Sequence, residues 1–209
     1  MIPELEETPP GEALFDFDGT LIEGDIGEST VRIFHDRGAL SAEVDHALGG
    51  RTWERYHTLD PVGQAVLCAV ALAGQTIAAV EAVVDEAFAL GRVTPRPAVC
   101  ELAAWMAVSH RVWVLSGSPE VVVRAAAPRV GIHRVMGLRS RIRGDQLTAE
   151  VEAPIPTDEG KVRVAWMRTG RRPVFAIGDS PWDLPILRHA RAARTTGRIA
   201  GREFPAFPL

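Results

Sequence analysis

Cysteine is almost missing from this chain, whose 209 residues include only two, Cys68 and Cys100. Small secreted domains that depend on disulfides carry several cysteine pairs, so this class of protein is excluded. Both cysteines stand in apolar segments with helical spacing. We therefore predict that they are buried, free thiols.

Long apolar runs are missing as well. No stretch of about 18 or more apolar residues is free of charge, so the sequence predicts no membrane-spanning helix. The N-terminus, MIPELEETPPGE, is acidic and rich in proline, and it has neither the basic region nor the apolar core of a signal peptide. We expect residues 1–11 to form a loose tail and, by default, the protein to be cytoplasmic.

A strong excess of one charge is also absent. The formal net charge is −4, with 24% charged and 46% hydrophobic residues, which is an ordinary balance for a soluble globular protein. A charge this small gives no electrostatic reason to expect nucleic acid or a membrane surface as a partner. No feature of the sequence indicates an oligomeric state.

What the chain does contain is an uneven pattern of strands and helices. A short apolar run at 12–17 predicts a buried strand, whereas residues 29–90 show only helical spacing of apolar positions. From about residue 95 onward, strand patterns alternate with helical patterns, which is typical of a parallel sheet with helices on both faces. The predicted domains are a Rossmann-like α/β core at 12–24 and 95–209 and an all-helical insert, or cap, at 25–94.

Polar side chains gather where three of the predicted strands end. The first strand is followed by DFDGT at 16–20, the second ends in SGS at 116–118, and a third leads into GDSPWD at 178–183. In an open parallel sheet the carboxyl ends of the strands form the ligand-binding edge, and Lys161, near the start of a predicted helix, can reach that edge. We therefore expect carboxylates, hydroxyls, backbone N–H groups and one ammonium to meet there.

Carboxylates that lie this close together repel one another unless a positive charge separates them. A divalent cation with oxygen ligands relieves the repulsion, and Mg²⁺ is the usual one beside phosphate groups. Taken singly, the same residues have simpler interpretations, because Asp-Gly is a common turn. Ser118 suits a helix N-cap, and Asp183 suits the first turn of a helix. The combination at strand ends favours a reaction centre.

The order of these motifs resembles that of the haloacid dehalogenase (HAD) superfamily. The matching segments are DFDGT at 16–20, VWVLSGS at 112–118, Lys161 and IGDSPWD at 177–183. The helical insert after the first motif, and a hairpin expected around RIRGDQLTAE, resemble the phosphoserine-phosphatase-like branch of this superfamily. The resemblance implies a phosphatase that acts on a small phosphorylated metabolite through an aspartyl-phosphate.

The resemblance assigns a role to each motif residue. Asp16 would be the nucleophile, and Asp18 would protonate the leaving alcohol and then activate water. Ser116 and the Gly117 N–H group would hold phosphate oxygens, and Lys161 would bind them and balance their charge.

The resemblance also implies Mg²⁺ as the cofactor. The side chains of Asp16 and Asp179 and the carbonyl oxygen of Asp18 would bind the ion. Asp183 would be a further ligand or lie just outside the ligands, and Thr20 would orient the loop that carries the first motif.

Substrate choice depends on the side chains around the leaving alcohol. Acidic residues after the first motif would attract a substrate ammonium and Arg51 would pair with a carboxylate, a combination that suits phosphoserine. An acidic and aromatic site would instead hold a quaternary amine such as phosphocholine. The candidate specificity residues are Glu23, Asp25, Glu28, Arg51, Trp53, Tyr56 and Trp182.

Other functions use the same scaffold. A dehalogenase needs neither an acid at the position of Asp18 nor a metal, so Asp18 and Asp179 argue against it. A phosphomutase or phosphotransferase would pass the phosphoryl group to a second substrate rather than to water. A non-catalytic module that binds phosphorylated ligands usually lacks the nucleophile, which this sequence carries as Asp16, and fold alone does not decide function.

Overall fold

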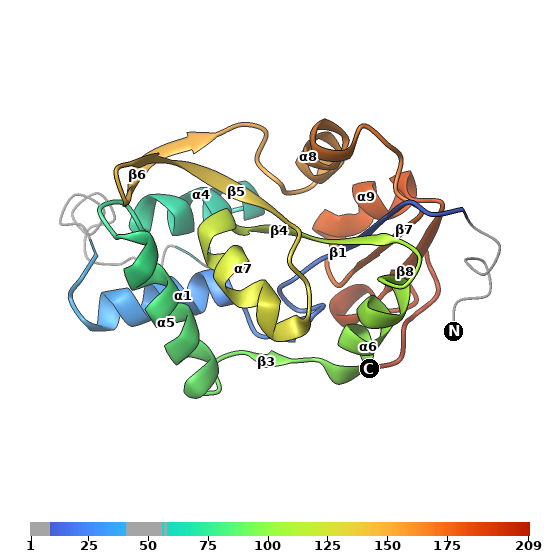
Figure 1. Cartoon of the computed structure of the whole chain (residues 1–209), viewed down its shortest axis with the longest axis horizontal. Coiled ribbons are helices and arrows are strands. Elements are labelled where there is room, and N and C mark those ends of the chain that lie inside the picture. The colour runs from blue at the N-terminus through green and yellow to red at the C-terminus, as the bar shows by residue number, and fades with distance from the viewer. Residues whose placement is uncertain (1–8, 41–55, 57) are drawn as a thin grey trace.

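A six-stranded sheet forms the centre of the molecule (Figure 1). The computed structural model describes residues 9–40, 56 and 58–209. The strand order is β6-β5-β4-β1-β7-β8, and all neighbours run parallel except β5 and β6. This mostly parallel sheet confirms the predicted α/β class. The strands are β1 (Glu12–Phe15), β4 (Arg111–Pro119), β5 (Val135–Arg143), β6 (Gln146–Glu152), β7 (Phe175–Gly178) and β8 (Ala192–Thr195).

Helices cover both faces of the sheet. The described helices are α1 (Ile26–Asp36), α4 (Pro61–Ala71), α5 (Ile77–Ala89), α6 (Pro97–Met106), α7 (Glu120–Ala126), α8 (Glu159–Thr169) and α9 (Leu184–His189). Ala13 and Phe15 of β1 belong to an apolar cluster with α1, α5, α6 and α7, whereas Leu14 packs with residues of α8 and α9. Because both faces of β1 are buried, the strand reads as a continuous apolar run in the sequence.

The first helix of the insert begins earlier than the spacing of apolar residues predicts. That spacing places the start at residue 29, but α1 starts at Ile26. Asp25 is the N-cap, and its Oδ1 accepts a hydrogen bond of 2.7 Å from the N–H group of Glu28. A capping carboxylate satisfies a backbone donor that would otherwise have no partner at the helix start.

The segments that enter and leave the helical insert lie side by side. β2 (Ile22–Glu23) pairs antiparallel with β3 (Thr94–Pro95), and the N–H group of Arg96 donates a 2.9 Å hydrogen bond to the carbonyl of Leu21. This two-stranded ribbon, which we call the β2–β3 ribbon, links the insert to the core.

The β5–β6 hairpin holds a second part of the insert. The turn lies at Gly144, where the sequence predicts it, and Gly144 has a φ of 64°. The N–H group of Gly74 donates to the carbonyl of Leu147 at 2.9 Å, and the N–H group of Ile77 donates to the carbonyl of Asp145 at 3.0 Å. The connection between α4 and α5 is thereby attached to the core.

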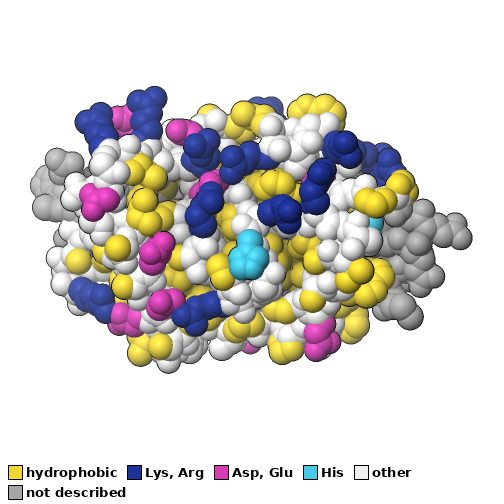
Figure 2. Space-filling model, viewed as in Figure 1, with side chains coloured by type: hydrophobic (Ala, Val, Ile, Leu, Met, Phe, Trp, Pro, Cys, Tyr) yellow, Lys and Arg dark blue, Asp and Glu magenta, His cyan; other side chains and the backbone are white. Residues whose placement is uncertain are grey.

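Lys and Arg side chains lie along the upper half of the face shown in Figure 2, over the β5–β6 hairpin and α8. On the hairpin these cations pair across the strands, because Arg139 lies 3.1 Å from Glu152 and Arg141 lies 2.9 Å from Glu150. Exposed pairs of this kind contribute little to stability. They do offset the positive charge of this face.

Two features of the sequence composition have structural counterparts. Both cysteines are free thiols, as predicted; Cys68 is buried in α4, whereas Cys100 in α6 is only half-buried. Over residues 9–40, 56 and 58–209, no helix combines the length and apolar character needed to cross a membrane.

Candidate active site

Asp16 stands directly after β1, at the carboxyl end of the parallel strands. Its N–H group continues the ladder between β1 and β7 with a 3.0 Å hydrogen bond to the carbonyl of Ile177. The hydroxyl of Thr20 donates to Asp16 Oδ2 at 3.1 Å. The buried Asp16 carboxylate is therefore held in a defined orientation at the sheet edge.

Asp18 is turned towards the end of β4 by hydrogen bonds to both of its oxygens. Oδ1 accepts from the N–H group of Ile26 at 2.7 Å, and Oδ2 accepts from the hydroxyls of Ser116 at 3.0 Å and Ser118 at 2.7 Å. The sequence also suggests Ser118 as the N-cap of α7, but that N-cap is Pro119, with no side-chain capping bond. Ser118 contacts the first motif instead.

Lys161 lies between two carboxylates. Its Nζ is 2.6 Å from Asp16 Oδ1 and also contacts Asp183 Oδ1. The other oxygen of Asp183 accepts hydrogen bonds from the N–H groups of Asp179, at 3.2 Å, and Ser180, at 3.0 Å. Asp183 therefore joins the ammonium of Lys161 to the backbone that follows β7.

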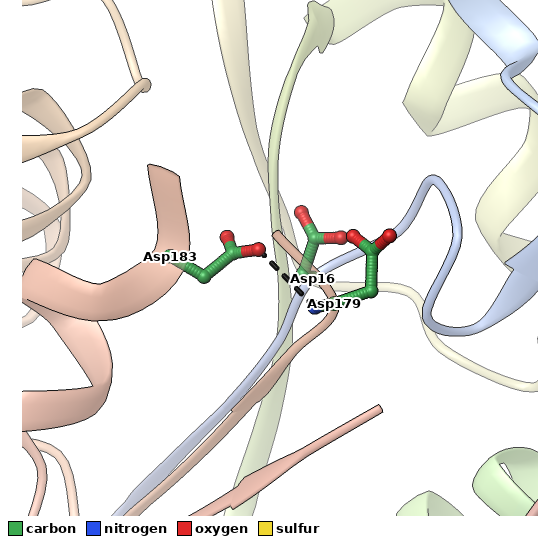
Figure 3. A group of neighbouring side chains, drawn as sticks. All are labelled: Asp16, Asp179 and Asp183. Atoms are coloured by element: carbon green, nitrogen blue, oxygen red, sulfur yellow. Dashed lines mark hydrogen bonds between the residues drawn. The ribbon is translucent and has the colours of Figure 1, made fainter. Parts of the chain in front are cut away.

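Three buried carboxylates converge at this point (Figure 3). Asp16 follows β1, Asp179 follows β7, and Asp183 belongs to the short 3₁₀ helix η3 (Pro181–Asp183). Each offers an oxygen atom within 4.8 Å of the other two. Oxygen donors at this separation suit a hard divalent cation such as Mg²⁺, so the residues present fit the cofactor that the sequence predicts.

Two glycines make this convergence sterically possible. Gly19 has a φ of 77°, and a Cβ atom there would lie 2.5 Å from Asp179 Oδ2. A Cβ atom on Gly178 would lie 2.5 Å from the Cβ of Asp183. A side chain at either position would displace a carboxylate of the cluster.

The electrostatics of the cluster favour a bound cation. Burial, followed by repulsion from Asp183, raises the pKa of Asp16 well above its usual range, and Lys161 opposes this shift. Burial and repulsion from Asp183 also raise the pKa of Asp179 to about 6. Burial lowers the pKa of Lys161, but attraction to Asp16 and Asp183 outweighs it and raises that pKa above its usual value. Ionised together, the carboxylates would carry more negative charge than the single ammonium neutralises, and a bound cation would lower their pKa values again.

A cavity of about 150 Å³ opens onto these residues. The motif residues Ser116, Gly117 and Lys161 line it, together with residues from α4 that include Gln64 and Cys68. A second cavity of about 310 Å³ shares part of this lining and extends to Gly24 and Glu28. The residues common to both cavities are Asp18, Asp25, Tyr56, Gln64, Asp179 and Arg198.

The candidate specificity residues fall into three groups. Asp25, Tyr56 and Trp182 line the first cavity, and Glu28 lines the second. Glu23 is exposed on β2 and lines neither. Arg51 and Trp53 lie outside the described residues.

The pKa values of Asp25 and Tyr56 are both raised beside the cavity. Burial and repulsion from Asp18 raise the pKa of Asp25 to about 8. Burial, followed by repulsion from Asp25, raises the pKa of Tyr56 above its usual value. Both side chains therefore favour their neutral forms beside the cavity.

Several lining residues are missed by sequence reasoning. The sequence could have indicated Ser118, because its hydroxyl belongs to the same SGS segment as that of Ser116. Thr157 lines the cavity with a buried hydroxyl that has no hydrogen-bond partner in the described part of the chain, and Arg198 follows β8. Neither belongs to a motif, so only the tertiary structure reveals them.

Comparisons with known proteins give one family and a set of similar structures. A family model described as haloacid dehalogenase-like hydrolase matches residues 13–188. No curated protein matches this chain. Among solved structures, a protein of unknown function from Bordetella pertussis Tohama I is 16% identical, with a TM-score of 0.75, over 96% of this chain and 99% of its own.

Two structures of phosphoserine phosphatases are also similar. One is a phospho-aspartyl intermediate analogue, which is 20% identical, with a TM-score of 0.59, over 90% of this chain and 87% of its own. The other is a substrate-bound complex, which is 18% identical, with a TM-score of 0.61, over 96% of this chain and 94% of its own. At these identities the likeness is one of fold.

Proposed function

Because this chain belongs to the haloacid dehalogenase-like hydrolase family, we propose that it is a Mg²⁺-dependent phosphomonoesterase. Its substrate is a small phosphorylated metabolite, and the phosphoryl group passes through an aspartyl-phosphate on Asp16. The observation that carries this proposal is the buried contact between Asp16 Oδ1 and Lys161 Nζ, at 2.6 Å, beside a second carboxylate, Asp18, that both serines of the SGS segment orient.

In the first step, an oxygen of Asp16 attacks phosphorus and the bond from phosphorus to the leaving alcohol breaks. Asp18 gives its proton to that alcohol. The raised pKa of Asp18, which burial causes against the effect of its hydrogen bonds, supports its role as a proton donor. In the second step Asp18 takes a proton from water, and the water oxygen displaces the Asp16 carboxylate to release inorganic phosphate.

The SGS segment and Lys161 would hold the phosphate oxygens. Gly117 lines the cavity, and a Cβ atom there would lie 3.1 Å from Cγ2 of Thr157. The absence of a side chain lets a phosphate approach the backbone, where the N–H group of Gly117 would donate to one of its oxygens. Ser116 adds a hydroxyl, and Lys161 adds the positive charge that an anionic nucleophile needs to approach an anionic phosphate.

Asp16, Asp179 and the carbonyl oxygen of Asp18 would hold Mg²⁺. When bound, this ion supplies positive charge to the phosphate oxygens. Both oxygens of Asp183 already have partners, in Lys161 and in the backbone after β7. These contacts favour Asp183 as the residue that positions Asp179 and Lys161.

The leaving alcohol would lie among Asp25, Tyr56 and Gln64, on the side of the cavity formed by the insert. A cavity of about 150 Å³ supports a small substrate. The Glu28 carboxylate supports an amine-bearing one, such as phosphoserine, and a bound ammonium would draw the neighbouring Asp25 towards its ionised form. The aromatic rings of Tyr56 and Trp182 would instead favour a quaternary amine such as phosphocholine.

Replacement of the nucleophile tests this proposal. We expect the wild-type protein to release inorganic phosphate from a panel of small phosphomonoesters when Mg²⁺ is present and to stop when EDTA is added. Asp16→Asn should lower kcat by about 10²-fold or more, because an amide cannot form the aspartyl-phosphate. Glu81→Gln, which changes an exposed carboxylate of α5, is the matched control and should retain full activity.

The outcome separates the proposal from its alternatives. Full activity of Asp16→Asn would refute the covalent mechanism. If the phosphoryl group appears on an added alcohol or sugar instead of in inorganic phosphate, the protein is a phosphotransferase or phosphomutase. If the wild-type protein binds phosphomonoesters in calorimetry without any turnover, it is a binding module.

A further inference from the structure

Arg198 reaches the candidate active site from a segment that none of the four motifs includes. It lies on the short 3₁₀ helix η4 (Gly197–Ile199), directly after β8. The N–H group of Thr196 donates a 2.9 Å hydrogen bond to the carbonyl of Gly178. Gly197 has a φ of 53°, and a Cβ atom there would lie 2.9 Å from the Cβ of Asp179. The backbone after β8 is therefore pressed against the fourth motif, and this contact places Arg198 beside the cavities.

The guanidinium of Arg198 has unused donors. Its Nε lies 3.6 Å from Asp179 Oδ2, which is too long for a hydrogen bond, and no hydrogen bond joins its side chain to any other residue that the structure describes. The side chain is 72% exposed and lines both cavities. A guanidinium offers five N–H donors in a planar fork, so this group can hydrogen-bond a ligand while it stays paired with Asp179.

Other charged side chains that the structure describes around the cavities already have partners. Lys161, the second cation among the described lining residues, is held by Asp16 and Asp183. Asp25 caps α1 through the N–H group of Glu28, and the Glu28 carboxylate lies 3.4 Å from Arg32. Among the residues that the structure describes, Arg198 is therefore the lining cation whose donors make no hydrogen bond within the protein.

We propose that Arg198 is a substrate-binding residue that recognises a carboxylate on the leaving group of the phosphomonoester. This inference rests on the proposed function, in which Ser116, Gly117 and Lys161 hold the phosphoryl group at the other side of the cavity. A planar guanidinium pairs bidentately with a carboxylate. The substrate class that follows is a phosphorylated hydroxy acid or amino acid that is small enough for the cavity of about 150 Å³. The sequence favours carboxylate recognition in the insert, at Arg51, whereas Arg198 lies in the core.

Matched pairs of substrates test the assignment. 2-Phosphoglycolate and ethyl phosphate differ in a carboxylate, and so do O-phosphoserine and O-phosphoethanolamine. For Arg198→Gln, we expect kcat/KM to fall by about 10-fold or more for the carboxylate-bearing member of each pair, since a charge-assisted pair is lost. The other member should change by less than about 3-fold. Arg202→Gln, an exposed arginine of the same segment, is the control and should leave all four values unchanged.

Other results overturn the proposal. An equal loss for both members of each pair would show that Arg198 only balances the charge of Asp179. No change for either member would show that it contacts no substrate. If the wild-type protein hydrolyses none of the four compounds, the proposed function fails. The inference is then decided by calorimetry, because Arg198→Gln must still weaken binding of 2-phosphoglycolate and not of ethyl phosphate.

Discussion

At the scale of single residues, the carboxylates of the site depend on positions where a side chain is missing. Gly19 lets the first motif turn with a positive φ beside Asp179, and Gly178 leaves room for Asp183. The chemistry therefore requires small residues as much as it requires acids, because each glycine lies directly against a carboxylate side chain of the cluster.

Gly19→Ala should damage both stability and the metal site. The new Cβ would lie 2.5 Å from Asp179 Oδ2, at a φ of 77°. We expect the free energy of unfolding, measured with denaturant in EDTA, to fall by about 2 kcal/mol or more, and calorimetry to give weaker Mg²⁺ binding. Gly144→Ala is the matched control, because Gly144 also has a positive φ, of 64°, but a Cβ atom there would meet nothing within 4 Å. It should lose about 1 kcal/mol and no Mg²⁺ affinity, and equal effects of the two changes would contradict the steric argument.

Asp25 makes stability depend on pH. Its pKa of about 8 in the folded protein exceeds the value of about 4 for an unfolded aspartate, so the folded state binds the proton more tightly. The stabilising contribution is complete below pH 4 or so and is lost as the pH rises towards about 8. Asp25→Asn keeps an acceptor for the N-cap and removes the titration.

The stability of Asp25→Asn relative to the wild-type protein should therefore increase with pH. Between pH 5 and pH 8 the difference in unfolding free energy should grow by about 1 kcal/mol, less than the full shift implies because the side chain is only half-buried. Denaturant unfolding in EDTA at several pH values measures it. A difference that stays constant over this range would show that Asp25 is ionised in the folded protein.

At the scale of elements, the N-caps of α4 and α5 allow an effect on stability to be distinguished from an effect on substrate binding. Asp60 caps α4 by accepting a 2.7 Å hydrogen bond from the N–H group of Gly63, and Thr76 caps α5 by accepting a 3.1 Å bond from Ala79. α4 lines the cavity through Pro61 and its neighbours, whereas no residue of α5 does. The two caps therefore support helices with different relations to the site.

Removal of each cap should have the same energetic effect and different kinetic effects. Asp60→Ala and Thr76→Ala should each lower the free energy of unfolding by about 1 kcal/mol, measured with denaturant. Only Asp60→Ala should raise KM for the phosphomonoester, because the start of α4 loses its fixed position beside the leaving group. A rise in KM for both variants would indicate that the whole insert moves as a unit, not α4 alone.

At the scale of the whole molecule, the sequence predicts the parts of the site that follow from strand ends. Asp16 and Asp179 are found this way, because parallel strands bring their carboxyl ends to one edge, and Lys161 reaches the same edge from the start of α8. Thr157 and Arg198 are not, since neither belongs to a motif and only the tertiary fold brings them to the cavity. The start of α1 is also missed, because the apolar spacing does not include the capping carboxylate of Asp25.

Ile22 and Pro95 are direct partners across the β2–β3 ribbon, so the insert departs from the core and returns to it at a single crossing. A segment attached in this way can become longer or shorter, or be replaced, while the distance between its two points of attachment on the core stays the same. Side chains around the leaving group can therefore diversify over evolutionary time while the strand ends that carry the acids stay in register. A new substrate preference, on this view, can arise through changes in the insert and in the η4 segment that leave the chemistry at Asp16 intact.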